Sequence, residues 1–254
     1  MVEKTLKRRL DNELTRRGLV TSRSQAESWI KLGKVTVDGL VVTKPGHFVT
    51  NNSDISLTTR EQYVSRAGLK LASVAQALGL SFQDTIVLDV GSSTGGFTDY
   101  ALQHGARKVY AVDVGTEQLH PSLRNNPKIE LHEKTDIRAF TLISDDSPEE
   151  ELKIKYPDII IIDVSFISLQ EILPYIATHL ATKQTRIVAM VKPQFEAGKA
   201  QINKGVIKND TIRRQILKDF ESWTKELFVI IAKQDSDVAG SKGNRERFYL
   251  LQNK

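Results

Sequence analysis

An unbroken run of four isoleucines, Ile159 to Ile162, most constrains how this chain can fold. A strand with one face in water alternates apolar and polar residues, whereas this run is apolar at every position. Such a strand is buried on both faces, which is typical of a parallel sheet covered by helices on each side. Apolar segments alternate with helical patterns after residue 63, so we expect a Rossmann-like, doubly wound α/β domain with a mostly parallel, seven-stranded sheet. The expected strands are 85–90, 108–114, 129–133, 158–164, 186–191, 227–233 and 248–252.

The first sixty residues follow a different pattern and are predicted to form a separate, small α+β domain. Apolar residues at four-residue spacing indicate a short helix over 6–17, and a second helix is expected over 22–32. An Asp-Gly turn between β-branched residues predicts a hairpin over 35–42, and one more strand is expected at 54–59. The predicted organisation is a small domain at 1–59, a linker at 60–63 and the α/β domain at 64–254.

Charge is divided unevenly between these two parts. The 254 residues include 36 Lys and Arg against 31 Asp and Glu, a net charge of +5. Residues 1–60 hold 11 of the basic and 6 of the acidic residues, so the whole excess lies there and the remainder is neutral. A basic module beside a neutral domain favours a polyanion such as RNA as the partner, although charge alone does not distinguish this from a solvated basic surface. Because few aromatic residues accompany the charges, a folded RNA is favoured over stacked single strands.

Several classes of protein are disfavoured by what the sequence lacks. Cysteine is absent and none of the five histidines pairs with another at ligand spacing, so we predict no metal site. No apolar run approaches the roughly 20 residues that a membrane span needs. The N-terminus is basic without an apolar segment behind it, which is unlike a secretory signal. We therefore expect a cytoplasmic protein with no membrane partner.

A glycine-rich turn follows the first strand of the expected sheet. Glycines at a strand-to-helix turn let a ligand approach the backbone, and the acid before them, Asp89, suits a cationic ammonium or sulfonium better than a pyrophosphate. Asp113 ends the next strand, where it can accept hydrogen bonds from ribose hydroxyls, and Asp136 is placed to reach an adenine amino group. We therefore predict S-adenosylmethionine as the cofactor. The candidate binding residues are Asp89, Gly91, Ser93, Thr94, Gly95, Gly96, Phe97, Asp113, Val114, Asp136, Ile137 and Asp163.

Four charged residues are expected to converge at the same edge of the sheet. Asp163 and Lys192 end two buried strands, Glu246 begins the last strand, and Lys70 lies on the helix before the first strand. Methylating a ribose 2′-hydroxyl requires removal of its proton as the oxygen attacks, and a lysine can act as the base. Each residue alone is explained as well by a salt bridge at a strand end, but four together beside the glycine turn favour a catalytic role. The four candidate catalytic residues are referred to below as the charged tetrad.

Six segments of this sequence resemble the TlyA family, whose members are often named hemolysin A. The resemblance covers essentially the whole chain, and it is most specific in Ile162-Asp-Val-Ser-Phe-Ile-Ser-Leu169 and Val191-Lys-Pro-Gln-Phe-Glu-Ala-Gly198. It implies an S4-type RNA-binding domain joined to an FtsJ-like methyltransferase domain. It also implies 2′-O-methylation of cytidines in ribosomal RNA by S-adenosylmethionine, with Lys70, Asp163, Lys192 and Glu246 as the tetrad and Lys192 as its base.

The RNA partner is expected to be ribosomal RNA or a ribosomal subunit, held through basic side chains. Phosphate contacts of this kind supply affinity and register rather than base choice. Two other functions stay open from the sequence: an RNA-binding module whose methyltransferase fold is silent, and a membrane-lytic protein. The candidate RNA-binding residues are Lys7, Arg8, Arg9, Arg17, Arg23, Lys34 and Arg66.

Overall fold

The structure is a computed structural model of the whole chain. It describes residues 7–20, 23–31, 33–58, 63–142, 156–197, 206–207, 209–238, 240 and 243–254. Parts of the sequence prediction lie outside these residues: residue 6 of the first helix, residues 22 and 32 of the second, residue 59 of the last short strand, and residues 60–62 of the linker.

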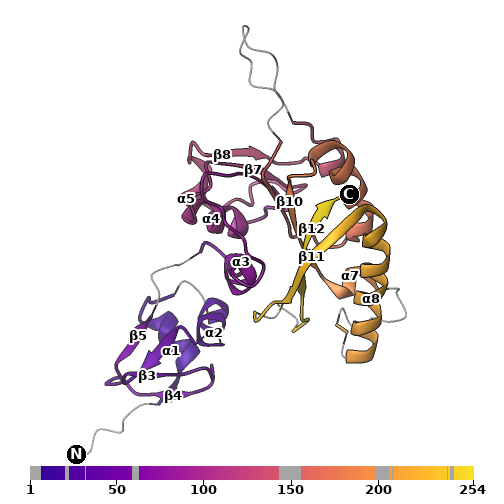
Figure 1. Cartoon of the computed structure of the whole chain (residues 1–254). Coiled ribbons are helices and arrows are strands. Elements are labelled where there is room, and N and C mark those ends of the chain that lie inside the picture. The colour runs from indigo at the N-terminus through magenta and orange to yellow at the C-terminus, as the bar shows by residue number, and fades with distance from the viewer. Residues whose placement is uncertain are drawn as a thin grey trace, which may run out of the picture.

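A seven-stranded sheet forms the centre of the larger domain (Figure 1), as predicted. Its order is β11-β12-β10-β9-β6-β7-β8, and only β12 runs against the others. The start of β12 therefore lies at the edge where the parallel strands end, with Arg247 paired to Val191. The strands are β6 (Ile86–Val90), β7 (Lys108–Val112), β8 (Ile129–His132), β9 (Ile159–Ile162), β10 (Arg186–Val191), β11 (Phe228–Asp235) and β12 (Arg247–Asn253).

Helices cover both faces of this sheet, which explains the unbroken apolar strands. Ile159 and Ile161 pack into one core together with α3 (Arg66–Ala75) and α4 (Gly96–Gln103). Ile160 and Ile162 pack into the core on the opposite face. That second core includes α8 (Asp210–Leu227), η2 (Leu169–Glu171), α6 (Leu173–Tyr175) and η3 (Ile176–Leu180). Each buried isoleucine contributes roughly 1.5–3 kcal/mol of burial free energy.

Three short helices complete the edge at which the parallel strands end. They are α5 (Pro121–Arg124), η1 (Ile137–Ala139) and α7 (Pro193–Glu196). Each follows a strand of the sheet along the chain, after β7, β8 and β10 respectively. The residues that leave these strands are therefore gathered at one edge, where α/β domains bind their ligands.

The small N-terminal domain contains two helices and two small sheets, α1 (Leu10–Arg16), α2 (Arg23–Lys31), β1-β4 and β3-β2-β5. The predicted helix over 6–17 is wrong at its start, because Arg8 and Arg9 form β1 and pair with Val49 and Phe48. A two-residue pairing with a distant strand leaves no local sequence signal. The strands are β1 (Arg8–Arg9), β2 (Val35–Val37), β3 (Leu40–Val41), β4 (Phe48–Val49) and β5 (Ile55–Leu57).

The two domains meet where α2 approaches α3 (Figure 1). Gln25 Nε2 donates a hydrogen bond to the carbonyl oxygen of Tyr63 at 3.2 Å. Buried residues of the small domain, such as Trp29, belong to one continuous apolar cluster with Tyr63 and the α3 residue Leu69. The small domain is thereby attached beside the helix that carries Lys70.

Candidate active site

The glycine turn after β6 requires a backbone that only glycine adopts easily. Gly91 has φ +80°, and a Cβ there would lie 2.8 Å from the carbonyl oxygen of Asp163. Gly95 begins α4 with φ +87°, and a Cβ would lie 2.6 Å from a methyl group of Leu123. A Cβ on Gly96 would overlap the Ser65 hydroxyl. Gly95 and Gly96 therefore pack against neighbouring helical segments, while Gly91 borders the site itself.

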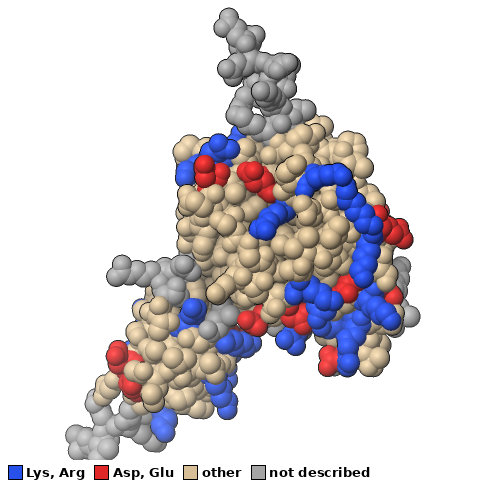
Figure 2. All heavy atoms as spheres, in the orientation of Figure 1, with Lys and Arg blue, Asp and Glu red and all other residues tan. Residues whose placement is uncertain are grey.

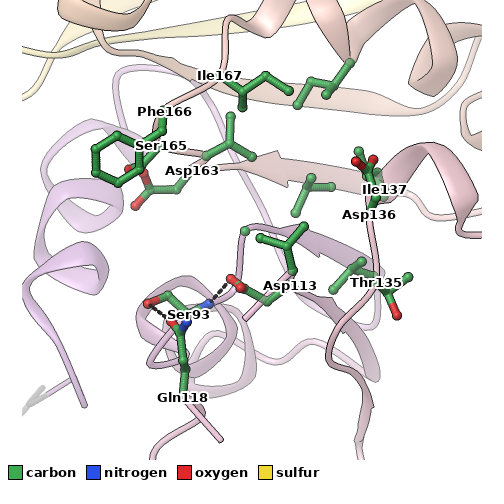
Figure 3. A pocket seen from close by; sticks show the side chains of 16 residues that line it. Ser93, Asp113, Gln118, Thr135, Asp136, Ile137, Asp163, Ser165, Phe166 and Ile167 are labelled. Carbon is green, nitrogen blue, oxygen red and sulfur yellow. Dashed lines mark hydrogen bonds between the residues drawn. The ribbon is translucent and has the colours of Figure 1, made fainter. Parts of the chain in front are cut away.

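A cavity of about 360 Å³ opens beside this turn (Figure 3). The ends of β6, β7 and β9 form its walls together with the segment that leads into η1. Six of the predicted cofactor residues besides Ser93 line it: Gly91, Asp113, Val114, Asp136, Ile137 and Asp163. The fold therefore brings predicted cofactor residues from four separate segments together around one cavity.

Two carboxylates of this cavity are held by hydrogen bonds. Asp113 accepts from the backbone N–H of Ser93 at 2.8 Å and of Gly115 at 2.7 Å. Asp136 accepts from two guanidinium nitrogens of Arg138, at 3.0 and 2.7 Å, and these bonds hold the pKa of Asp136 below its usual range. Both side chains are oriented before any ligand arrives, although Asp136 shares its oxygens with Arg138.

A smaller hollow of about 140 Å³ adjoins the cavity and shares Gly91, Ser93 and Asp163 with it. Asp89 lines this hollow and is fully buried. Its Oδ2 accepts a hydrogen bond from Thr98 Oγ1 at 2.6 Å, and its Oδ1 has no hydrogen-bond partner among the described residues. Burial, with a smaller contribution from the carboxylates of Asp163 and Asp113, raises the pKa of Asp89 to about 7. Thr94 and Phe97 also line this hollow.

The charged tetrad is assembled as two ion pairs, and only Asp163 and Lys192 line the smaller hollow. Lys192 Nζ lies 2.6 Å from Asp163 Oδ1 and donates to Ser165 Oγ at 2.7 Å. Lys70 Nζ lies 2.6 Å from Glu246 Oε2. Both lysines are only 9% exposed. Burial raises the pKa of Glu246 above its usual range, although the Lys70 ammonium opposes this effect.

Comparisons with known proteins identify the family to which this chain belongs. The FtsJ-like methyltransferase family matches residues 63–254, and the S4 domain matches residues 8–55. The chain is 37% identical to the 16S/23S rRNA (cytidine-2′-O)-methyltransferase TlyA of Mycobacterium tuberculosis, over 96% of this chain and 89% of that protein. The chain belongs to the TlyA family of FtsJ-like methyltransferases. This family membership confirms the resemblance seen in the sequence.

Other TlyA relatives carry different names. Hemolysin A of Brachyspira hyodysenteriae is 38% identical, over 94% of this chain and 97% of that protein. A solved structure of a Streptococcus thermophilus protein described as a hemolysin has a TM-score of 0.69 and 36% identity, covering 98% of this chain and 89% of that one. Within the described part of this TlyA chain, no helix combines the length and apolarity that crossing a bilayer requires.

Some residues of the TlyA site were not predicted from the sequence. Ser165 lines both cavities and accepts the hydrogen bond from Lys192. Phe166 has φ +67°, is 92% exposed and lies at the cavity wall (Figure 3), with its ring centroid 5.2 Å from that of Phe195. Gln118 accepts a hydrogen bond from Ser93 Oγ at 3.0 Å. The motifs around Asp163 and Lys192 indicated that this region is functional, but they did not show which neighbouring side chains face the cavity.

The predicted RNA-binding arginines of the S4 domain are organised by two buried acids. Asp11 accepts hydrogen bonds from Arg9, at 3.0 and 2.7 Å, and from Arg23 at 3.1 Å. Glu13 accepts from Arg16 at 2.8 and 2.6 Å and from Arg17 at 2.8 Å, and these bonds, first of all those from Arg16, lower the pKa of Glu13 to about 2.

The predicted basic residues differ in how accessible they are. Arg17 also donates to the carbonyl oxygens of Thr50, Asn51 and Ser53, so it ties the domain together. Arg8 donates to Asn51 Oδ1 at 2.6 Å. The remaining three differ in exposure: Lys7 and Lys34 are exposed, whereas Arg66, at the start of α3, is half-buried.

Proposed function

We propose that this protein transfers a methyl group from S-adenosylmethionine to the 2′-hydroxyl of a cytidine in ribosomal RNA, in the cytoplasm. The observation that carries this proposal is the charged tetrad, two lysine–carboxylate pairs of which one, Lys192 with Asp163, lines the hollow beside the glycine turn. The substrate class follows from the S4 domain and from the name of the Mycobacterium tuberculosis relative.

The residues around the cavity fit S-adenosylmethionine. The larger cavity offers the Asp113 carboxylate to ribose hydroxyls and apolar walls, including Val114 and Ile137, to an adenine ring. The smaller hollow offers the unpartnered, buried Oδ1 of Asp89 to an ammonium group. When bound, the cofactor would supply an electrophilic methyl group.

Lys192 is the proposed base. In its neutral form, Nζ accepts the proton of the ribose 2′-hydroxyl as the oxygen forms its bond to the methyl carbon and the sulfur–methyl bond breaks. Asp163, at 2.6 Å, stabilises the ammonium that results. Lys70 and Glu246 hold each other beside this pair and place a further ammonium near the developing oxyanion.

RNA contacts are proposed on both domains. Although the methyltransferase domain is neutral overall, Figure 2 shows Lys and Arg gathered over α8 and the adjoining part of the sheet. At the tetrad edge, Asp235 accepts hydrogen bonds from Arg213 at 2.9 Å and Arg247 at 2.6 Å, and Arg245 lies 3.6 Å from it. Arg245 precedes Glu246 directly, so basic side chains border the proposed active site as well as the S4 domain.

The proposal is tested by incubating the protein with methyl-labelled S-adenosylmethionine and ribosomal subunits that lack the modification. We expect label in ribosomal RNA, located at the ribose of a cytidine by nuclease digestion and mass spectrometry. Binding of the RNA without transfer would favour the silent-module hypothesis instead. Leakage from liposomes at physiological salt would favour the membrane-lytic hypothesis, and we expect none.

Cofactor affinity is expected to depend on pH through Asp89. Only the carboxylate form can pair with an ammonium, and the ionised fraction falls as pH drops through about 7. The dissociation constant for S-adenosylmethionine should therefore rise about tenfold for each pH unit below that value. Isothermal titration between pH 5.5 and 7.5 measures this slope. The Asp89→Asn variant should bind more weakly at pH 7.5 and lose the slope; an identical slope in the variant would refute the assignment.

Lys7 and Lys34 are expected to contribute sequence-independent RNA affinity. Both side chains are exposed, so the double substitution Lys7→Gln/Lys34→Gln should leave folding intact. It should weaken RNA binding and reduce the slope of log K against log salt by about 2, roughly one for each lost phosphate contact. Filter binding from 50 to 200 mM salt measures both. The control Lys183→Gln/Lys254→Gln also removes two exposed lysines and should leave the slope unchanged.

A further inference from the structure

The pairing between β9 and β10 ends before the residues of the proposed active site. The last paired residues of these two parallel strands are Ile162 and Ala189. Asp163 and Lys192 both lie past that point, so no backbone ladder sets the distance between them. The 2.6 Å contact between Lys192 Nζ and Asp163 Oδ1 therefore depends on other links between the two loops.

Glu196, the last residue of α7, supplies two such links. Its Oε1 accepts a hydrogen bond from the backbone N–H of Leu169 at 2.8 Å. Its Oε2 accepts from the Ser168 hydroxyl at 2.5 Å. In the regions that the structure describes, no Lys, Arg or His forms an ion pair with Glu196. Both of its carboxylate oxygens accept hydrogen bonds from the opposite loop instead.

One further contact joins the two loops, because the rings of Phe166 and Phe195 are 5.2 Å apart. Within the loop after β10, Lys192 Nζ lies 5.9 Å from the centroid of the Phe195 ring, so this ring links the contact to Lys192. Hydrogen bonds to a carboxylate are stronger than those between neutral groups, so the Glu196 links are the stiffest of this set. Burial raises the pKa of Glu196, as expected for a half-buried carboxylate held by neutral donors.

We propose that Glu196 is a positioning residue that joins the two loops and so holds Asp163 and Ser165 on Lys192. The inference rests on the proposed function, because Lys192 is the proposed base. Glu196 lines neither cavity, so its proposed role is exerted through Lys192 and Asp163. A misplacement of about 1 Å at a reacting group can reduce a rate by up to about 100-fold.

Three variants separate positioning from a general loss of folding. Glu196→Ala removes both hydrogen bonds and should lower kcat about 10- to 100-fold, while KM for RNA and Kd for S-adenosylmethionine change less than about threefold. Glu196→Gln can still accept from Leu169 and donate to Ser168, so it should recover most of kcat. The control Glu171→Ala removes an exposed acid from η2 and should behave as wild type.

A second measurement does not depend on activity. The Leu169 amide should exchange hydrogen faster in Glu196→Ala than in wild type and in Glu196→Gln, because that N–H loses its acceptor. Faster exchange with an unchanged kcat in an active enzyme would overturn the positioning role, as would unchanged exchange. A parallel fall of kcat and thermal stability in both Glu196 variants would also overturn it. If wild type transfers no methyl group, the proposed function fails, and the exchange data still decide whether Glu196 holds the loop.

Discussion

Replacing Lys192 by alanine is expected to lower methyl transfer to ribosomal RNA by at least about 100-fold, the usual contribution of a general base. Lys192 Nζ is buried at the smaller hollow and touches both Asp163 and Ser165. It lines only the smaller hollow and not the larger cavity proposed for the adenosine part of the cofactor, so most cofactor contacts remain and Kd for S-adenosylmethionine should change only a few-fold. Single-turnover transfer and isothermal titration, carried out on the same preparations, measure the two effects.

The variant Lys192→Arg distinguishes a base from a positive charge. Arginine retains the charge that could stabilise an oxyanion, but its guanidinium does not lose a proton in proteins. We therefore expect Lys192→Arg to be nearly as inactive as Lys192→Ala. Recovery of more than about a tenth of wild-type activity would show that Lys192 acts through its charge. Lys183→Ala, an exposed lysine before the other end of β10, serves as the control and should remain fully active.

Replacing Gly91 by alanine is expected to weaken S-adenosylmethionine binding by at least about 30-fold. The residue combines φ +80° with a backbone atom, Asp163 O, 2.8 Å from any added Cβ. The neighbouring backbone gives little room to adjust, because Gly91 N donates to Val112 O and Asp163 N donates to Val90 O. An alanine at this position costs about 1–2 kcal/mol for the left-handed backbone alone. The added Cβ also clashes with Asp163 O, so the backbone that separates the two hollows must move.

Gly79→Ala is the matched control for this substitution. Gly79 also has a positive φ, +61°, but nothing lies within 4 Å of an added Cβ. It should cost about 1 kcal/mol of stability, measured by thermal unfolding, and leave cofactor binding unchanged. Wild-type affinity in Gly91→Ala would show that the glycine turn does not shape the cofactor site. A loss of affinity in both variants would point to general destabilisation instead.

Local patterns were sufficient to predict most strands of the sheet. Apolar runs such as Ile159–Ile162 predict a buried strand, because burial on both faces requires apolar residues at every position. The glycine turn could be predicted equally well, since a positive φ at Gly91 favours glycine at that position. The two-residue strand Arg8–Arg9 was missed because its partner, Phe48–Val49, lies some forty residues away.

Side-chain partnerships were much less predictable. Arg17 was one of the candidates for RNA contact, yet it donates to three backbone carbonyls and to Glu13. Glu196 followed Lys192 in a recognised motif, but nothing in the motif shows that its partners are Ser168 and Leu169. Hydrogen-bond partners depend on how separate loops meet, which no single segment encodes.

The sequence by itself determined the class of the sheet and the glycine turn, because periodicity and backbone conformation are local properties. It also predicted that the four charged residues of the tetrad converge, and their catalytic role stays a prediction. The tertiary structure alone decided that Lys192 pairs with Asp163 and Lys70 with Glu246. It also decided that β12 runs against its neighbours, which brings Glu246 to the edge where Asp163 and Lys192 leave the sheet. Ion pairs require sub-ångström placement of groups far apart in the chain, and only the packing of the complete sheet and its helices provides it.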